Sequence, residues 1–222
     1  MLLAIDTSTA QMGLAAYDGA QVLAEMAWTN RQFHTVELAP STAGLLARCG
    51  LTMEAVTALG VAIGPGSFTA LRVGLSFAKG LALARRLPLI GIPTLDVVAA
   101  AQPVSDLPLV ATLQAGRGRL AVGWYAASEN GWQAQGPAKV ETVDSLAEQI
   151  QNPTIVCGEL NAEERQRLAR KRVNVVLMTA ANSVRRPAIL AELAWARWQA
   201  GKVDDLSSLA PIYLHAAEPI PG

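Results

Sequence analysis

The sequence predicts an α/β protein built from two similar halves, each a mixed β-sheet covered by helices. Each half shows the same order of elements: three strands, a helix, and then two strand–helix pairs. Between the halves, "QPVSDLP" at residues 102–108 holds two prolines and is the best linker candidate. Three meandering strands followed by strand–helix crossovers give a mixed sheet with helices on its faces. The 51% hydrophobic and 16% charged residues are typical of a compact globular chain.

The first half opens with an apolar strand and a polar turn. Asp18-Gly19 is a hairpin signal between its second and third strands. Gly50 suits the left-handed position that follows a helix, and Thr52 is expected to cap a short helical turn after it. The expected strands are 2–6, 13–17, 21–28, 59–63 and 88–92, and the expected helices are 36–49, 67–86 and 94–101.

The second half repeats this order without a close sequence repeat, so the duplication lies in the elements alone. Asn161 and Glu164 match the reciprocal capping pattern at a helix start. Pro187 and Gly201 suit the first position of the last helix and the residue just past its end. The expected strands are 108–114, 120–127, 132–140, 154–158 and 173–178, and the expected helices are 143–150, 162–170 and 187–201. We expect domains at 1–103 and 104–222, and we leave open that the final helix or tail packs on the N-terminal half.

Two such halves facing each other form the duplicated actin-like ATPase (ribonuclease H-like) architecture, which sugar kinases share. In that architecture the first hairpin turn usually grips a phosphate of ATP. Here Asp6, Thr7, Ser8 and Thr9 offer a carboxylate, hydroxyls and backbone N–H groups for that contact. The alternative is that these side chains close a tight turn through local hydrogen bonds. In the second half Gln114 stands where a kinase would carry an acidic base or magnesium partner.

Other chemistry is poorly supported by the residues. The two histidines, His34 and His215, lie in different halves and form no His-x-x-x-His helix, so we assign no metal ligand. "GPGSFT" is not the nucleophile elbow of hydrolases, and we assign no catalytic residue. Equal numbers of basic and acidic residues, 18 each, argue against a long-range grip on RNA. We expect a cytoplasmic chain with no membrane span and with buried free thiols at Cys49 and Cys157.

The stretch "AIGPGSFTALRVGLSFAKG", residues 62–80, is the most informative part of the chain. Gly64, Pro65, Gly66 and Ser67 are predicted to form a structural turn, with Ser67 as a helix cap. The helix after it is apolar nearly all round and must be covered on more than one side. We predict a partner interface made of Phe68, Ala70, Leu71, Arg72, Val73, Gly74, Phe77 and Ala78.

The small residues of this helix recur every four positions, as Ala70, Gly74 and Ala78 and as Ser76, Gly80 and Ala84. Small residues at that spacing allow the backbone of another helix to approach closely. An arginine at Gly74 should then abolish association and leave the chain folded. The alternative is that the chain's own domain covers the helix.

These residues resemble the bacterial TsaB (YeaZ) family. The resemblance rests on "MLLAIDTST" at the start, on "GPGSFTALRVGLSFAKGLA", and on "APIYLHAAEP" near the end, in order and at the right spacing. His34, Leu38 and Pro40 also fit the family's His-Ser-x-x-Leu-x-Pro helix opening. The sequence departs from the family pattern at Ala70, Gln114 and His215, where glycine, aspartate and arginine are usual.

The resemblance implies a two-half actin-like fold and a role in making threonylcarbamoyladenosine in tRNA. It implies a non-catalytic partner of the related catalytic subunit TsaD, which is joined by the ATPase TsaE. Docking would use helices of the N-terminal half, with tRNA contacted only through the complex. The isolated chain is expected to form a homodimer through the same patch. It needs no cofactor of its own, and ATP can bind within the complex.

The residues also bear on two other functions. A free-standing ATP-dependent phosphotransferase of this fold is motivated by Asp6 and the hydroxyl-rich turn after it. Peptidase activity is disfavoured, because the chain shows no nucleophile–base pair.

Overall fold

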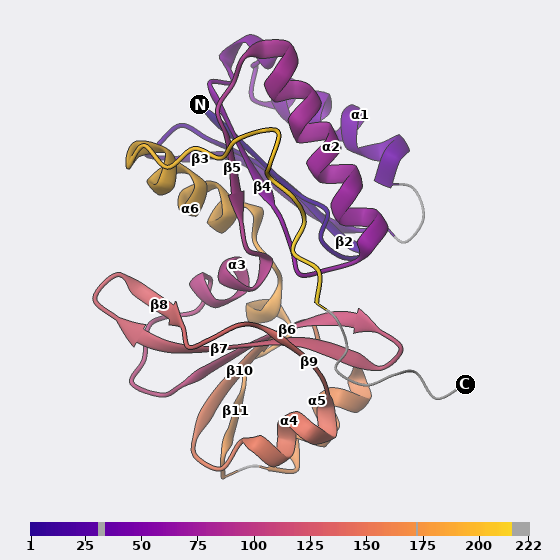
Figure 1. Cartoon of the computed structure of the whole chain (residues 1–222), viewed down its shortest axis with the longest axis vertical. Helices are drawn as coiled ribbons and strands as arrows, with labels where there is room; N and C mark the ends of the chain where they lie inside the picture. Colours follow the sequence, from indigo (N-terminus) through magenta and orange to yellow (C-terminus); the bar gives the residue numbers. More distant parts are fainter. Residues whose placement is uncertain (31–33, 172, 215–222) are drawn as a thin grey trace. The chain divides into compact units, whose positions relative to one another are not determined.

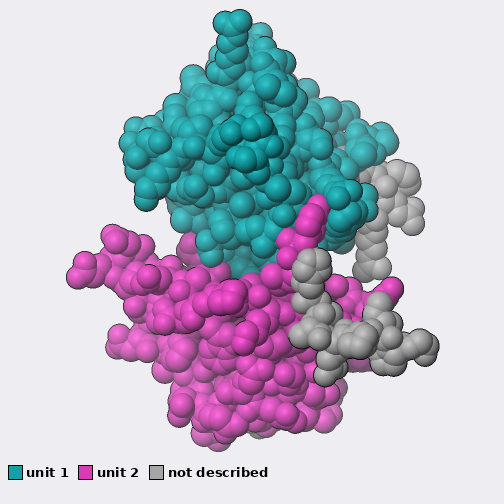
Figure 2. Space-filling view, viewed as in Figure 1, with its two compact units in different colours: residues 1–97, 185–212 teal, residues 98–184, 213–222 magenta. Residues whose placement is uncertain are grey.

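The computed structural model describes residues 1–30, 34–171 and 173–214, which fall into two compact units. Unit 1 comprises Met1–Val97 and Arg185–Ile212 (Figure 2). Unit 2 comprises Val98–Val184, with Tyr213 and Leu214 of the described tail. Unit 1 is therefore discontinuous in sequence, and the segment 185–212 belongs with the N-terminal half rather than with 104–222.

Unit 1 is built on a five-stranded mixed sheet (Figure 1). Its strands are β1 (Leu2–Asp6), β2 (Gln11–Tyr17), β3 (Val22–Thr29), β4 (Ala58–Ala62) and β5 (Leu89–Ile92). Their order is β3-β2-β1-β4-β5, with β1, β2 and β3 antiparallel and β1, β4 and β5 parallel. Strand β1 is buried along its whole length, which is expected of a central strand covered on both faces.

The two faces of this sheet are covered by different helices (Figure 1). Helices α1 (His34–Arg48) and α2 (Phe68–Arg85) pack on the face formed by Leu3, Ile5 and their neighbours. Helix α6 (Pro187–Gln199) packs on the opposite face, against Leu2 and the small residues Ala4, Ala15 and Ala58. That face admits the helix closely, since a Cβ atom at Gly60 would lie 2.7 Å from the Cβ atom of Ala194. This close contact is why the last helix belongs to unit 1.

Unit 2 repeats the sheet topology of unit 1. Its strands are β6 (Leu109–Gly116), β7 (Arg119–Ser128), β8 (Gly131–Ala134), β9 (Lys139–Thr142), β10 (Thr154–Gly158) and β11 (Val175–Leu177). Their order is β11-β10-β6-β7-β8, and β9 also pairs with β7. Helices α4 (Val143–Gln149) and α5 (Ala162–Ala169) cover its core. The parallel order of β6, β10 and β11 matches that of β1, β4 and β5, and it confirms the predicted duplication.

One predicted strand, 132–140, is wrong as a single element. The structure splits it into β8 and β9, which pair with opposite ends of β7. Gly136, with φ of +151°, and Pro137, which lacks an N–H donor, interrupt the ladder between them.

The short elements follow local sequence signals. They are the 3₁₀ turns Met53–Ala55 and Ala181–Ser183 and helix α3 (Thr94–Ala100). The capping box at α5 is confirmed, because Asn161 Oδ1 accepts from Glu164 N at 2.9 Å and Glu164 Oε2 accepts from Asn161 N at 2.7 Å. Thr52 occupies the cap position of its turn but makes no capping hydrogen bond with its side chain. Across the described ranges, no helix combines the length and the apolar character needed to cross a bilayer.

After α6, the chain runs along the β5 edge of the unit 1 sheet. Asp204 N donates to Leu89 O at 3.0 Å, and Ile212 N donates to Ile63 O at 2.7 Å. Asp204 Oδ2 also accepts from Gly91 N at 2.8 Å. This segment satisfies backbone groups that an edge strand would otherwise leave unpaired.

Candidate docking surface

The glycine-rich turn before α2 packs closely against the backbone at Ser8 and at Ile212. A Cβ atom at Gly66 would lie 2.1 Å from Ser8 O, and one at Gly64, whose φ is +107°, would lie 2.6 Å from Ile212 O. Ser67 N donates to Ser8 O at 2.7 Å. Ser67 holds the predicted cap position of α2, but its side chain makes no capping hydrogen bond. The glycines therefore allow close backbone approach within unit 1.

The hydroxyl groups of the β1–β2 turn have partners inside unit 1. Thr7, Ser8 and Thr9 are all buried. Thr7 Oγ1 donates to Ala70 O at 2.7 Å, and Ser8 Oγ shares a 2.8 Å hydrogen bond with Thr94 Oγ1. These bonds tie the turn to α2 and to the start of α3.

The carboxylate of Asp6 is buried and is paired with Arg185. Asp6 Oδ1 accepts from Ser8 N at 2.8 Å, while Asp6 Oδ2 accepts from Arg185 Nε. Both terminal nitrogens of Arg185 donate to Thr9 Oγ1 at 3.2 Å, and Nη2 donates to Gln11 O at 2.6 Å. Arg185 was not predicted as a site residue from the sequence. The signal for it was Asp6 itself, since a carboxylate at the end of a buried strand needs a cation.

These partners decide how well the β1–β2 turn suits a phosphate group. Its hydroxyls and one of its amides are engaged in internal hydrogen bonds, and its carboxylate holds a guanidinium. A phosphate would need free donors that converge on one point. The residues present do not fit that group, and the geometry favours the structural interpretation of the turn.

Half of the predicted interface on α2 points into unit 1. Ala70, Leu71, Gly74 and Ala78 are buried. A Cβ atom at Gly74 would lie 2.2 Å from Thr7 Oγ1, so this glycine faces the β1–β2 turn. The row Ala70, Gly74 and Ala78 therefore packs inside unit 1. This agrees with the alternative that the chain's own domain covers the helix. An arginine at position 74 would disrupt the fold, and it cannot serve as a surface probe.

The other four predicted residues are exposed or half-buried. Phe68 is 54% exposed, and Arg72 is exposed beside it. The guanidinium carbon of Arg72 lies 3.6 Å from the centroid of the Phe68 ring, which is a cation–π contact. Val73 and Phe77 are half-buried.

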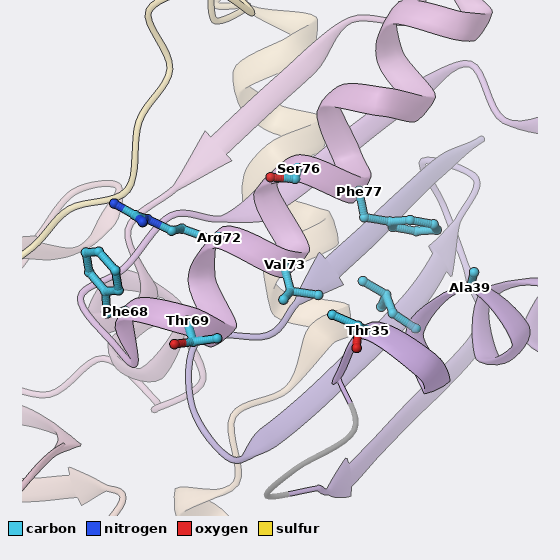
Figure 3. Close-up of a pocket in the computed structure, with 9 residues that line it drawn as sticks. Thr35, Ala39, Phe68, Thr69, Arg72, Val73, Ser76 and Phe77 are labelled. Carbon is cyan, nitrogen blue, oxygen red and sulfur yellow. The ribbon is translucent and has the colours of Figure 1, made fainter.

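A groove of about 440 Å³ lies between α1 and α2. Figure 3 shows Val73 and Phe77 directed from α2 toward Thr35 and Ala39 of α1. The groove is lined by Thr35, Leu38, Ala39, Phe68, Thr69, Arg72, Val73, Ser76 and Phe77. It is mostly apolar and open, and it lies entirely within unit 1.

The outer faces of α1 and α2 carry small and apolar side chains beside this groove. Exposed small residues form one row at Ala39, Ala43 and Ala47 of α1 and another at Ser76, Gly80 and Ala84 of α2. Val36 and Leu83 are 67% and 66% exposed. Both rows follow four-residue spacing, which lets a further helix pack closely. We call the two rows and the groove the docking surface.

The docking surface is basic at its margins. Helix α2 contains no acidic residue, and Arg48, Arg72 and Arg86 are exposed. The one acidic residue of α1, Glu37, accepts a 2.9 Å hydrogen bond from Trp28 Nε1. The surface therefore favours a partner with carboxylates.

In the equivalent turn of unit 2, Gln114 is hydrogen-bonded to two glutamate side chains. Gln114 Nε2 donates to Glu164 Oε2 at 2.7 Å, and Gln114 N donates to Glu159 Oε2 at 3.3 Å. Among the residues that the structure describes, no three histidine, cysteine, aspartate or glutamate side chains form a metal-like group. His34 is the first residue of α1, and His215 lies outside the described residues.

Comparison with known proteins decides the family. Over residues 21–211 the chain matches the family model described as "TsaD: tRNA N6-adenosine threonylcarbamoyltransferase". It is 31% identical over 163 residues to the tRNA threonylcarbamoyladenosine biosynthesis protein TsaB of Escherichia coli, covering 71% of this chain and 70% of that protein. The chain belongs to the TsaB (YeaZ) family. The TsaB protein of Bacillus subtilis is 32% identical over 124 residues, which cover 56% of this chain and 54% of that protein.

Solved structures support the same fold for this TsaB-family chain. YeaZ from Pseudomonas aeruginosa matches with a TM-score of 0.78 at 23% identity, over 96% of this chain and 99% of that one. A hexokinase from Thermus thermophilus matches with a TM-score of 0.51 at 11% identity, over 89% and 99% of the two chains. At these identities the likeness concerns the fold, and it agrees with the predicted actin-like, sugar-kinase-like architecture.

Proposed function

We propose that this TsaB-family chain is a non-catalytic subunit of the complex that forms N6-threonylcarbamoyladenosine in tRNA. In this proposal it docks on the catalytic subunit TsaD, and the ATPase TsaE joins the pair. The names of the TsaB relatives support the pathway, because they are called tRNA threonylcarbamoyladenosine biosynthesis proteins. The docking role rests on the geometry of unit 1.

The observation that carries the proposal is the contrast between two faces of α2. Its inner face rests on the β1–β2 turn through Thr7 and Gly74. On its outer face, beside the groove, small residues are exposed to solvent together with Phe68 and Leu83. An apolar surface of this kind, with basic margins, is typical of a site for another protein.

The polar turns support a non-catalytic subunit. In unit 1 the carboxylate of Asp6 is neutralised by Arg185, and in unit 2 Gln114 cannot accept a proton as a carboxylate would. The family model that matches the chain bears the name of a transferase. In this proposal the transfer belongs to TsaD, and this chain supplies the surface that holds it.

The remaining parts of the proposal follow from this role. The chain needs no cofactor of its own, and any ATP is bound within the complex. Contact with tRNA is made through the complex, because the chain has balanced charge, with 18 basic and 18 acidic residues. The complex acts in the cytoplasm.

A reconstitution tests the proposal. Purified TsaD and TsaE are supplied with tRNA and the activated threonylcarbamoyl donor, with and without this chain. We expect modified tRNA only when the chain is present, and none from the chain alone. Equal modification without the chain would refute the subunit role. ATP turnover by the isolated chain would instead favour the free-standing phosphotransferase.

A further inference from the structure

Among the residues of unit 1 that the structure describes, Arg185 and Asp6 form a deeply buried pair of charges. The side chain of Arg185 is 1% exposed and that of Asp6 is 2% exposed. All three guanidinium nitrogens donate to the β1–β2 turn, reaching Asp6 Oδ2, Thr9 Oγ1 and Gln11 O. The turn therefore forms a fitted guanidinium site, and a side chain 179 positions from Asp6 fills it.

A buried carboxylate requires a cation that is well placed and fully hydrogen-bonded. A planar guanidinium suits the Asp6 site, because its fork can donate at once to a carboxylate, a hydroxyl and a carbonyl oxygen. Arg185 is also the first residue of the segment that returns to unit 1. It can thus hold the turn and anchor the start of that segment together.

The same turn supports the inner face of α2. Thr7 Oγ1 donates to Ala70 O at 2.7 Å, and Ser8 O accepts from Ser67 N at 2.7 Å. We propose that Arg185 is a positioning residue, a built-in cation that fixes the β1–β2 turn and through it sets the docking surface of α2. The consequence for docking rests on the proposed function, while the guanidinium site stands on the geometry of unit 1.

The test begins with Arg185→Ala in the full chain, which leaves an unpaired carboxylate beside an empty space. Without added ligand the thermal midpoint should fall by roughly 10 °C. Methylguanidinium chloride, at concentrations far below denaturing ones, should raise the midpoint of the variant but not that of the wild type. Sodium chloride at equal ionic strength should not raise the midpoint of the variant. If methylguanidinium and sodium stabilise the variant equally, the guanidinium site is refuted.

The second readout is docking, measured below the unfolding temperature. Arg185→Ala should bind TsaD roughly two- to thirtyfold more weakly than wild type, and methylguanidinium should restore the affinity. In the isolated variant, faster hydrogen exchange of the Leu71 amide should report a loosened first turn of α2. Unchanged affinity and unchanged exchange would refute the positioning role. Failure of the wild type to bind TsaD would refute the proposed function instead, and would leave the rescue of the midpoint as an independent result.

If Arg185→Ala does not fold, two milder variants keep the test decisive. Arg185→Lys retains the charge without the fork, and it should be intermediate in midpoint and in affinity. The double variant Asp6→Asn/Arg185→Gln lacks both charges, so methylguanidinium should not raise its thermal midpoint. Rescue of this double variant would contradict a site that depends on the Asp6 carboxylate.

Discussion

Gly74 of helix α2 lies directly against Thr7 of the β1–β2 turn, because a Cβ atom at residue 74 would come within 2.2 Å of Thr7 Oγ1. The same hydroxyl donates to Ala70 O at 2.7 Å, one helical turn earlier. The β1–β2 turn, which the sequence suggested as a phosphate site, supports a helix in this structure. The close contact and the hydrogen bond together hold α2 against the β1–β2 turn.

The first prediction concerns the two glycines of α2. Gly74→Ala should lower the free energy of unfolding by about 1–3 kcal/mol, because the new methyl group displaces the buried Thr7 side chain. Gly80→Ala is the matched control, since a Cβ atom there meets nothing within 4 Å. Alanine at that exposed helical position should stabilise the chain by about 0.5–1 kcal/mol. Urea denaturation of both variants measures the difference, and equal effects would contradict the contact.

The second prediction concerns Cys157 and pH. Burial raises the pKa of its thiol to about 12, from an ordinary value of 9.0. The unfolded chain therefore releases this proton at lower pH than the folded chain does. Stability attributable to Cys157 should be fully present below about pH 9 and should decline as the pH rises toward 12. Comparing wild type with Cys157→Ala in denaturation curves across this range isolates the contribution, and identical slopes would contradict it.

Thiol accessibility gives an independent readout of the same burial. At pH 8 the native chain should leave Cys157 unmodified by a thiol reagent, while partly exposed Cys49 reacts. Denaturant should make Cys157 reactive. Modification of Cys157 in the native chain, located by mass spectrometry of peptides, would contradict the burial.

The third prediction concerns self-association. With no partner present, the isolated chain should form a homodimer through the docking surface about a two-fold axis. Light scattering across a range of concentrations measures the mass. Ser76→Trp, which places a bulky side chain in the outer small-residue row of α2, should shift the equilibrium to monomer. A wild-type monomer at every concentration would contradict this use of the surface.

Much of the fold could be predicted from the sequence, because local signals and tertiary packing agree. Alternating apolar strands, the Asn161–Glu164 capping box and Pro187 at the start of α6 all correspond to elements in the structure. The error at 132–140 has a local cause, since Gly136 and Pro137 interrupt an otherwise strand-like stretch. The packing of α6 on the unit 1 sheet could not be predicted in the same way. It depends on small residues of several strands lying together on one face of the folded sheet.

The docking surface was only partly predictable. Four-residue spacing identified both small-residue rows of α2, but spacing alone cannot say which row faces the sheet. Gly74 and Ala78 pack inward, whereas Ser76 and Gly80 are exposed. Arg185 could not be paired with Asp6 from spacing, because the two residues are brought together only by the return of the chain to unit 1.

The most direct test of the docking surface is the affinity of full-length variants for TsaD, measured by calorimetry. Ser76→Trp obstructs the outer row of α2, and Ala196→Trp places the same side chain on the exposed side of α6, across the sheet. Both should fold, as circular dichroism would verify. We predict that Ser76→Trp weakens binding by about tenfold or more, which corresponds to about 1.4 kcal/mol, and that Ala196→Trp binds as wild type does. Wild-type affinity for Ser76→Trp would contradict docking through the outer face of α1 and α2.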